Sequence, residues 1–231
     1  MIISIHQPNY LPYPGFFHKL SLSDIFVIMD DVQYQYDHTN RNKIVANNAE
    51  GWTRITIPTK KQHKFSSIMN VEINNELSWR ETNWHQIYES YKGSAFFNLY
   101  QEYLENLYKK EWTHLFDINF EIIKKFIELL NIKTKIVLES ELNVSGNATE
   151  RLVNVCKIIG ADTYVSGMGG KIYLDEKLFA ENKIKLIYQN YTPVVYPQQS
   201  SKLFIPNLSI LDLLANVGSD SLKLIKNDAQ I

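Results

Sequence analysis

The chain has 231 residues, of which 45% are hydrophobic and 21% are charged, and its formal net charge is -1. This near-neutral balance argues against a general nucleic-acid binder, and no apolar run approaches the roughly 20 residues of a membrane span. The single cysteine, Cys156, excludes an internal disulfide and a cysteine metal cluster.

The beginning of the chain reads MIISIHQPN, with no basic segment and no small-residue cleavage site. We therefore expect no signal peptide and a cytoplasmic location. The length suits a single α/β domain over residues 1–231.

The first predicted element is a buried strand over residues 1–5, followed by the loop HQPNYLPYPGFFHK. The prolines of this loop end the strand, and Phe16, Phe17 and Leu20 have the spacing of a helix. A loop that opens a helix favours anions, because the first helical amides have no internal partner. The alternative is that its histidines are structural, one in the core and one on the surface. The candidate ligand-binding residues of this stretch are His6, Gln7, Asn9, Tyr10, His18 and Lys19.

A second buried strand is predicted over residues 24–29, and it ends in Asp30-Asp31. Two strands joined by a short helix predict a parallel pair, and parallel sheets bind ligands beyond the carboxyl ends of their strands. Neighbouring strand residues point to opposite faces, so unless the strand has already ended, one aspartate faces a ligand and the other is structural. The candidates here are Asp30, Asp31 and Gln33, with Asp31 the catalytic one.

The next stretch, 35–48, is polar and is predicted to be a loop. Its chemical centre is Asn40-Arg41-Asn42-Lys43. These residues are either ordinary exposed charges or a clamp for a phosphate or carboxylate. Residues 52–58 then alternate apolar with polar and end at a proline, as a half-buried strand does.

Residues from 79 to about 131 show mainly helical spacing. We expect this block to be a helical insertion or lid on the sheet, with no visible chemistry of its own.

The remaining chain alternates strands and helices. A strand at 136–138 precedes a helix opened by Asn147, whose spacing to Glu150 predicts a capping box. A strand at 163–165 then enters a glycine-containing loop that is either a ligand cradle or a structural turn, but is not a P-loop. A strand at 184–188 and a helix at 210–217 capped by Ser209 complete the order. The candidates in this half are Ser166, Gly167, Gly169, Gly170, Lys171, Tyr173 and Gln198.

This order predicts an α/β protein with a mainly parallel, Rossmann-like sheet, flanking helices and a helical insertion. The strings IHQPNYLPYPGFFHKL, SDIFVIMDDVQY, NRNKI, SGMGGKIYL and SILDLL support a more specific assignment. They resemble the WbqC-like proteins of bacterial surface-polysaccharide gene clusters. The resemblance runs from Ile5 to Leu214 and implies transfer of glycine, another amino acid or an acyl group to an O-antigen sugar.

The layout has a more distant likeness to nucleotidyltransferases and adenylating α/β enzymes. Those carry an H-x-G-H signature here, from which Gly15-Phe16-Phe17-His18 departs in spacing, and only Gly169-Gly170-Lys171 stands in for their lysine loop. This likeness leaves ATP and Mg²⁺ open as cofactors, and we assign no metal ligands.

Two functions from different classes fit these residues. The first is a transferase or an ATP-dependent ligase acting on a sugar, with His6 as base or orienting group and Arg41 and Lys43 at an anionic leaving group. His18, a further catalytic candidate, and Lys19 would hold negative charge. The second is a non-catalytic protein that binds a nucleotide-sugar or a partner. Either protein would bind a small molecule or nucleotide-sugar and no nucleic acid, and the sequence does not set the oligomeric state.

Overall fold

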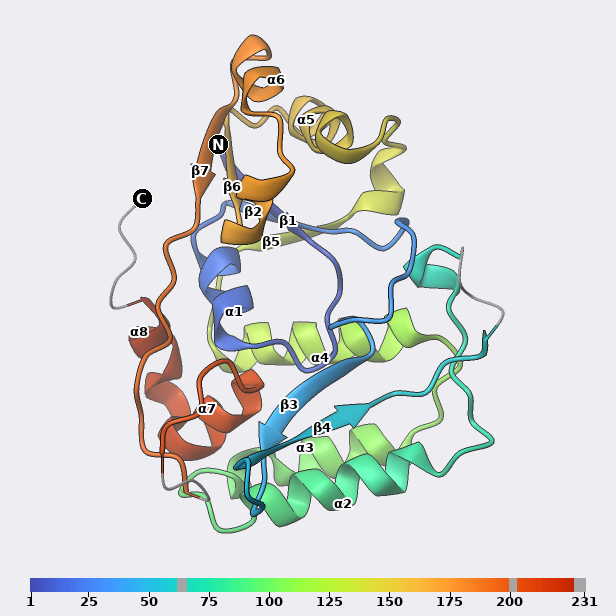
Figure 1. Cartoon of the computed structure of the whole chain (residues 1–231), viewed down its shortest axis with the longest axis vertical. Helices are drawn as coiled ribbons and strands as arrows, with labels where there is room; N and C mark the ends of the chain where they lie inside the picture. The colour runs from blue at the N-terminus through green and yellow to red at the C-terminus, as the bar shows by residue number, and fades with distance from the viewer. Residues whose placement is uncertain (62–65, 200–202, 227–231) are drawn as a thin grey trace.

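A computed structural model describes residues 1–61, 66–199 and 203–226 (Figure 1). Its main element is a five-stranded, fully parallel sheet with the order β5-β2-β1-β6-β7. The strands are β1 (Ile2–His6), β2 (Ile25–Ile28), β5 (Lys135–Leu138), β6 (Thr163–Ser166) and β7 (Lys185–Tyr188). The predicted α/β, Rossmann-like class is therefore confirmed.

The central strand β1 pairs with both β2 and β6, as the sequence predicts. Ile3 is opposite Ile25, and Ile2 is opposite Thr163. The chain builds β2 and β5 on one side of β1 and β6 and β7 on the other, so the strand order reverses between β1 and β6. Ligands bind beyond the carboxyl ends of the strands at such a reversal. The strand ends at His6, one residue later than predicted.

Helices cover both faces of the sheet (Figure 1). One face carries Ile3 and Ile5 and packs against α5 (Ala148–Ile159) and α6 (Glu176–Glu181). The other face packs against α1 (Pro14–Ser21), where Phe17 meets Phe126 of α4 (Leu115–Leu129) at 6.1 Å between ring centroids. Because β1 alternates, Ile5 points to the α5 face and His6 points to the α1 face.

The helical stretch from residue 79 forms α2 (Trp79–Tyr91), α3 (Asn98–Lys109) and α4. Asn119 of α4 donates hydrogen bonds to Pro8 O at 2.8 Å and Thr39 O at 2.7 Å. This block therefore supports the loop after β1, a contribution that its helical periodicity does not reveal. Its status as an insertion or lid stays a prediction.

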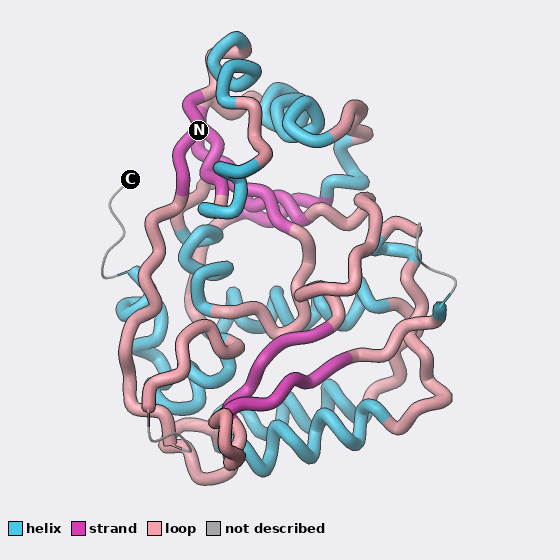
Figure 2. Tube along the Cα trace, viewed as in Figure 1, coloured by secondary structure: helices cyan, strands magenta, loops and turns pink. Residues whose placement is uncertain are grey.

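The predicted loop at 35–48 is wrong in its second half, where β3 (Arg41–Val45) pairs antiparallel with β4 (Trp52–Thr56). Figure 2 shows this pair, hereafter the hairpin, as a separate ribbon away from the main sheet. Its inner face carries Asn42 and Ile44, which are buried. Polar and charged residues occupy three of the five positions of β3. Its buried and half-buried positions therefore do not alternate between apolar and polar residue types, and the sequence does not reveal the strand.

The helix ends test two capping predictions. Ser209 accepts from the Leu211 N–H at 3.2 Å, as predicted. Gly160, at φ +77°, ends α5. The predicted capping box is wrong, because the Asn147 side chain makes no cap hydrogen bond. The other helical segments are α7 (Ile210–Val217), α8 (Ser221–Lys226) and the 3₁₀ turns η2 (Ile68–Asn70), η3 (Glu139–Leu142), η4 (Met168–Ile172) and η5 (Gly218–Asp220). None of the helices in the described ranges is long and apolar enough to cross a lipid bilayer.

Candidate functional site

A cleft of about 780 Å³ lies beyond the carboxyl ends of β1, β2 and β6. We call it the sheet-edge compartment. Its wall includes most of the residues predicted from the first loop, from the end of β2 and from the glycine-containing segment. These are His6, Gln7, Asn9, Lys19, Asp31, Gln33, Ser166, Gly167, Gly169, Gly170 and Tyr173.

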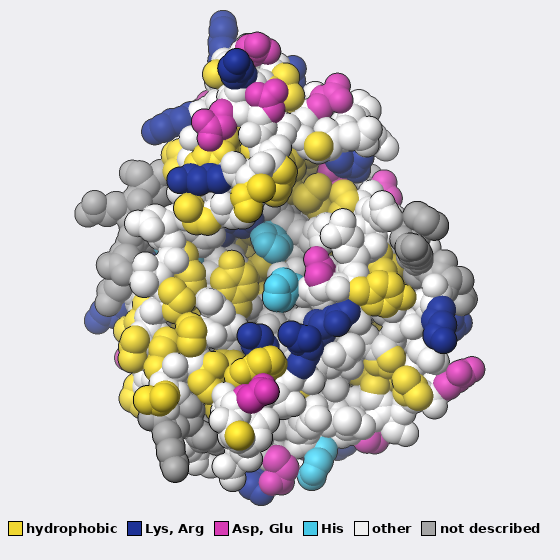
Figure 3. Space-filling view, viewed as in Figure 1, with side chains coloured by type: hydrophobic (Ala, Val, Ile, Leu, Met, Phe, Trp, Pro, Cys, Tyr) yellow, Lys and Arg dark blue, Asp and Glu magenta, His cyan; other side chains and the backbone are white. Residues whose placement is uncertain are grey.

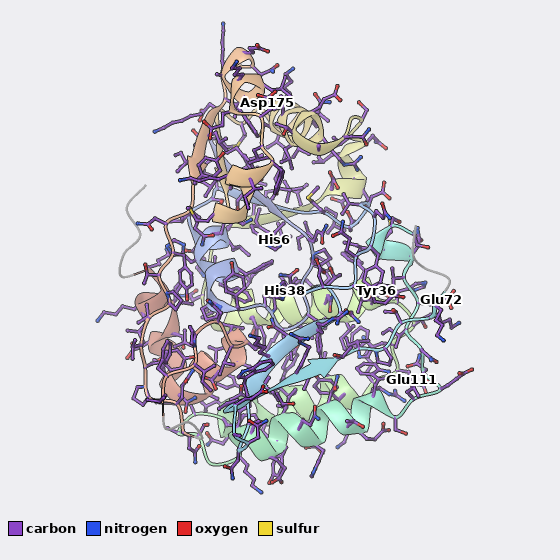
Figure 4. The ribbon with its side chains drawn as sticks, viewed as in Figure 1. His6, Tyr36, His38, Glu72, Glu111 and Asp175 are labelled. Carbon is purple, nitrogen blue, oxygen red and sulfur yellow. The ribbon has the colours of Figure 1, made fainter. Side chains whose placement is uncertain are left out.

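A second cavity of about 620 Å³ adjoins the first and is lined by the hairpin. We call it the hairpin compartment. The two share five wall residues, namely His6, Asn9, Tyr13, Asp37 and His38. In Figure 3 two histidines lie together in this hollow, at the place where Figure 4 labels His6 and His38, with a group of basic side chains beside them. The cleft thus has two halves, one at the sheet edge and one at the basic hairpin, and His6 and His38 lie where the two halves meet.

His6 ends β1, and its ring position is set by two contacts. The Nδ1 atom lies 2.9 Å from Gln7 O, and the ring meets Phe16 edge-on at 5.0 Å between centroids. A carbonyl oxygen only accepts, so Nδ1 carries the proton in the neutral ring and Nε2 keeps its lone pair. Burial first, and the nearby Lys19 charge second, lower the pKa of His6 to about 3. The side chain is therefore a neutral hydrogen-bond acceptor in the free protein.

Lys19 lies beside His6 on the wall of the sheet-edge compartment. Its side chain is 4% exposed, and its Nζ donates to Ile5 O at 2.9 Å. Among the described residues no carboxylate lies within 4.0 Å of this amine. Burial lowers the pKa of Lys19 to about 7, because the low-polarity surroundings disfavour its charged form. Near neutral pH a positive charge at Lys19 is therefore available to pair with a bound anion, because no carboxylate of the described residues pairs with it.

The loop after β1 is held from two distant parts of the chain. Asn42 of β3 donates to Tyr10 O at 3.2 Å and to Leu11 O at 2.7 Å. Leu11 has φ +43°, a left-handed conformation that a leucine adopts only under constraint. Asn119 holds the preceding Pro8 carbonyl. These contacts fix the direction in which Asn9, between them, faces the cleft.

The two aspartates lie beyond the end of β2 at Ile28, and they have different surroundings. Asp30 is buried and accepts from Ser140 N at 3.0 Å and Ser140 Oγ at 2.6 Å. Asp31 is exposed on the wall of the sheet-edge compartment. Asp30 therefore joins β2 to the end of β5, and Asp31 is the carboxylate that a ligand can reach.

The glycine-containing segment after β6 forms η4 rather than an open loop. Gly170 is required there, because a Cβ at this position would lie 2.3 Å from Ser166 Oγ and 2.8 Å from Leu174 Cδ1. Lys171 is exposed with its Nζ 5.1 Å from the Tyr188 ring centroid, and it does not line either compartment. The segment closes the sheet-edge compartment, but its lysine points elsewhere.

The hairpin presents a basic face to the second compartment. Lys43 is directly opposite Arg54, and Arg41 is two residues before Lys43 on the same face. Lys43 Nζ lies 4.2 Å from the Trp52 ring centroid. Arg41 Nε donates to Asn40 Oδ1 at 3.2 Å. Arg41, Asn42 and Lys43 all line this compartment.

Several predicted site residues lie outside both compartments. His18 is buried, with Nδ1 2.7 Å from Gln189 Nε2, and Tyr10 is buried against the Tyr108 hydroxyl. Gln198 bonds Asp212 and Ile205 near α7. The whole set outside the compartments is Tyr10, His18, Asp30, Asn40, Lys171 and Gln198, whose proposed roles in binding or catalysis stay predictions.

The cleft also contains residues that the sequence reading did not single out. The sequence does contain a feature that points to Arg54, because this charged residue lies at an exposed position of the predicted strand 52–58. His38 and Asp37 lie in the polar stretch before the hairpin, where nothing distinguishes them from ordinary loop residues. The polar and aromatic members of this additional set are Tyr13, Tyr36, Asp37, His38, Arg54, Asn147, Arg151, Tyr164 and Asn207.

Metal-ligand groups are sparse. In the described ranges no three or more His, Cys, Asp or Glu side chains gather as a metal site would require. Asp31 and Asp37 are the carboxylates on the wall of the sheet-edge compartment. Mg²⁺ in nucleotide sites commonly uses one or two carboxylates together with substrate phosphates, so these two residues would be its protein ligands if ATP binds here.

Comparison with known proteins assigns the chain to a family. A curated protein of Mycobacterium tuberculosis (strain ATCC 25618 / H37Rv), described as uncharacterized protein Rv1507c, is 31% identical over 221 residues, which are 95% of each chain. No solved structure gives a significant match. The model of the WbqC-like protein family matches residues 7–224, and the chain therefore belongs to the WbqC-like family.

Proposed function

We propose that this protein is a transferase of bacterial surface-polysaccharide biosynthesis that attaches an amino acid or another acyl group to a sugar. The observation that carries this proposal is the neutral His6 ring at the reversal of the strand order. His6 lies on the wall shared by the compartment that contains Lys19 and the compartment that contains the hairpin cations. Membership of the WbqC-like family suggests a polysaccharide-related role. That role makes a sugar the expected acceptor.

Acyl transfer to a sugar requires three things of the protein. A proton must leave the attacking hydroxyl or amine, negative charge on the acyl oxygen or the leaving group must be stabilised, and water must be kept out. We assign the first task to the Nε2 atom of His6 and the second to Lys19. The hairpin cations Arg41 and Lys43 attract an anionic substrate to the cleft.

The low pKa of His6 needs an explanation in this mechanism, since a general base works best when its pKa is near the working pH. The free protein contains two effects that keep the ring neutral, burial and the Lys19 charge. A bound anionic donor would offset both, because an anion near the ring favours the imidazolium form. We therefore expect His6 to become an effective base only in the substrate complex.

This order of events also fits Lys19, which is partly neutral near pH 7 in the free protein. An anionic donor would raise the Lys19 pKa and fix the positive charge where negative charge develops. The donor would thus set the protonation states of both residues. ATP as the activating cofactor, with Mg²⁺ held by Asp31 and Asp37, is the extension of this scheme that the distant enzyme likeness suggests.

The test is a product assay with purified protein, using candidate amino acids with ATP and candidate nucleotide-sugars, and mass spectrometry to detect an acylated sugar. His6→Ala should lower the transfer rate by about 10²- to 10⁴-fold, the usual range for loss of a general base. His85→Ala is the matched control, because His85 is an exposed histidine of α2 outside both compartments.

A folded His6→Ala protein that transfers at the wild-type rate would remove His6 from the mechanism. Binding of a nucleotide-sugar without any product, in the wild type, would favour the alternative of a non-catalytic binding protein. Circular dichroism of each variant separates a chemical defect from loss of the fold.

A further inference from the structure

The hairpin face contains an unusual arrangement of charge. Lys43 and Arg54 are direct cross-strand partners, and like charges in this position destabilise a strand pair. Among the described residues no carboxylate lies within 4.0 Å of Arg41, Lys43 or Arg54. The wall of the hairpin compartment offers one carboxylate, Asp37, against these three cations.

Asp37 offsets only part of that charge, because it is one carboxylate against three cations. Its Oδ1 accepts from Thr39 N at 3.0 Å and from Thr39 Oγ1 at 2.9 Å, which ties the carboxylate to its own turn. The compartment therefore keeps an excess of positive charge next to a half-enclosed space of about 620 Å³. A space of this size accommodates a small ligand, and the charge selects an anion that can meet several cations at once.

An aromatic side chain on the same wall narrows the choice of anion. The Tyr36 side chain is 51% exposed, although it is a large hydrophobic residue. Its ring packs against the buried Tyr34 at 5.0 Å between centroids. An exposed ring with a rigid backing is a surface on which a base or a sugar ring can stack.

We propose that the hairpin compartment binds a nucleoside diphosphate-linked sugar, with the diphosphate on Arg41, Lys43 and Arg54 and the base on Tyr36. The sugar would extend toward His6 and His38, the residues that this compartment shares with the sheet-edge compartment. The inference rests on the proposed function for one point, that this ligand is the acceptor. The activated acyl donor then occupies the sheet-edge compartment beside Lys19.

This division gives the reaction two anionic substrates in separate places. The hairpin cations neutralise the diphosphate of the acceptor, whereas Lys19 faces the donor. The acceptor hydroxyl or amine attacks the acyl carbon of the donor, its proton passes to His6 Nε2, and the donor's leaving group departs with the bonding electrons. The diphosphate of the acceptor stays intact, since it serves only as a handle.

Binding can be tested without turnover, by isothermal titration calorimetry with uridine diphosphate, uridine, inorganic pyrophosphate and glucuronate as probes. Uridine diphosphate should bind the wild type, and Lys43→Gln and Arg54→Gln should each weaken it by about 10- to 150-fold, as expected for one charge-assisted contact. Lys185→Gln is the matched control, because Lys185 is an exposed strand lysine outside both compartments.

Tyr36→Ala separates the two halves of the ligand. It should weaken uridine diphosphate and leave pyrophosphate binding unchanged, because pyrophosphate has no ring to stack. Glucuronate distinguishes a sugar carboxylate from a diphosphate as the source of negative charge. Binding of glucuronate in preference to uridine diphosphate, or equal binding by wild type and Arg54→Gln, would overturn the proposal.

The result is independent of the proposed function, because calorimetry with uridine diphosphate measures binding and requires no transfer. A protein that binds this probe through the hairpin but forms no acylated sugar supports the subsite and contradicts the transferase. A protein that transfers in a His6-dependent manner but does not bind nucleoside diphosphates contradicts the subsite alone.

Discussion

The two halves of the cleft differ in how far their ionisable groups are buried. At the sheet edge, Lys19 and His6 are enclosed by packed elements, and burial shifts both pKa values downward. On the hairpin, Lys43 and Arg54 stand opposite each other at the surface. Enclosed groups can change protonation when a ligand arrives, whereas cations nearer the surface attract an anionic ligand from solution. This difference is the reason we propose proton transfer at the sheet edge and substrate capture at the hairpin.

The strongest test of the sheet edge removes the support of its loop. Asn119→Ala leaves two buried carbonyls, those of Pro8 and Thr39, without their donor. We expect a loss of about 2–5 kcal/mol in the free energy of unfolding, measured by urea denaturation. Asn106→Ala, on the exposed surface of α3, is the control and should change little. Equal stability of the two variants would mean that the loop does not depend on α4.

The next effect concerns the buried amine. The folded-state pKa of Lys19 is below its unfolded value of 10.5, so the unfolded chain binds more protons between pH 7 and pH 10.5. This group therefore makes stability rise with pH across that window. From pH 7 to pH 9.5 the wild type should gain on the order of 3 kcal/mol relative to Lys19→Met, at about 1.4 kcal/mol per pH unit.

Urea denaturation of both proteins at several pH values measures this difference, and the comparison cancels the titration of groups that they share. Lys185→Met provides the exposed control. Parallel stability curves for wild type and Lys19→Met would show that Lys19 titrates normally, and the contrast between enclosed and surface charge would then fail.

On the hairpin, one cation can be removed at a time. Arg41→Ala should weaken binding of an anionic ligand such as uridine diphosphate by about 1.5–3 kcal/mol, the cost of one charge-assisted contact. Raising the salt concentration should reduce the wild-type affinity more than that of Arg41→Ala, since fewer charges remain to be screened. Calorimetry at two salt concentrations measures both effects. Identical salt dependence would exclude Arg41 from the ligand contact.

The smallest expected effect is on stability without ligand. Arg54→Thr removes the like charge opposite Lys43 and places a residue with good strand propensity there. The free energy of unfolding should rise by about 0.2–1 kcal/mol. Lys43 would keep its contact with the Trp52 ring. A less stable Arg54→Thr protein would indicate that Arg54 serves the hairpin rather than a ligand.

The sequence predicted the sheet edge better than the hairpin, and the reason is physical. Residues 1–31 are a local β-loop-helix-β unit, whose apolar runs and prolines mark each boundary, so parallel pairing and a shared edge follow directly. The hairpin buries Asn42 and leaves Arg41 and Lys43 half-buried, so a polar residue faces the core and the strand lacks the expected hydrophobic pattern.

Individual side chains were harder to place than elements. His18 and Tyr10 belong to the most distinctive loop, yet each turns inward to a partner far along the chain, Gln189 or Tyr108. Nothing within the loop reveals those partners. The position of Lys19, in contrast, can be inferred locally, because Lys19 belongs to the helix that directly follows the loop.

The loop that follows His6 is short, but its closure is not local. Asn42 reaches Tyr10 from 32 positions later in the chain, and Asn119 reaches Pro8 from 111 positions later. During folding, the loop must therefore wait for β3 and α4 to dock before it can adopt the left-handed Leu11 conformation, since long-range contacts form only after the intervening chain is ordered. The same dependence holds on heating. If either asparagine contact breaks first, the cleft loses its shape while the five-stranded sheet remains folded. Inactivation would then precede the main unfolding transition.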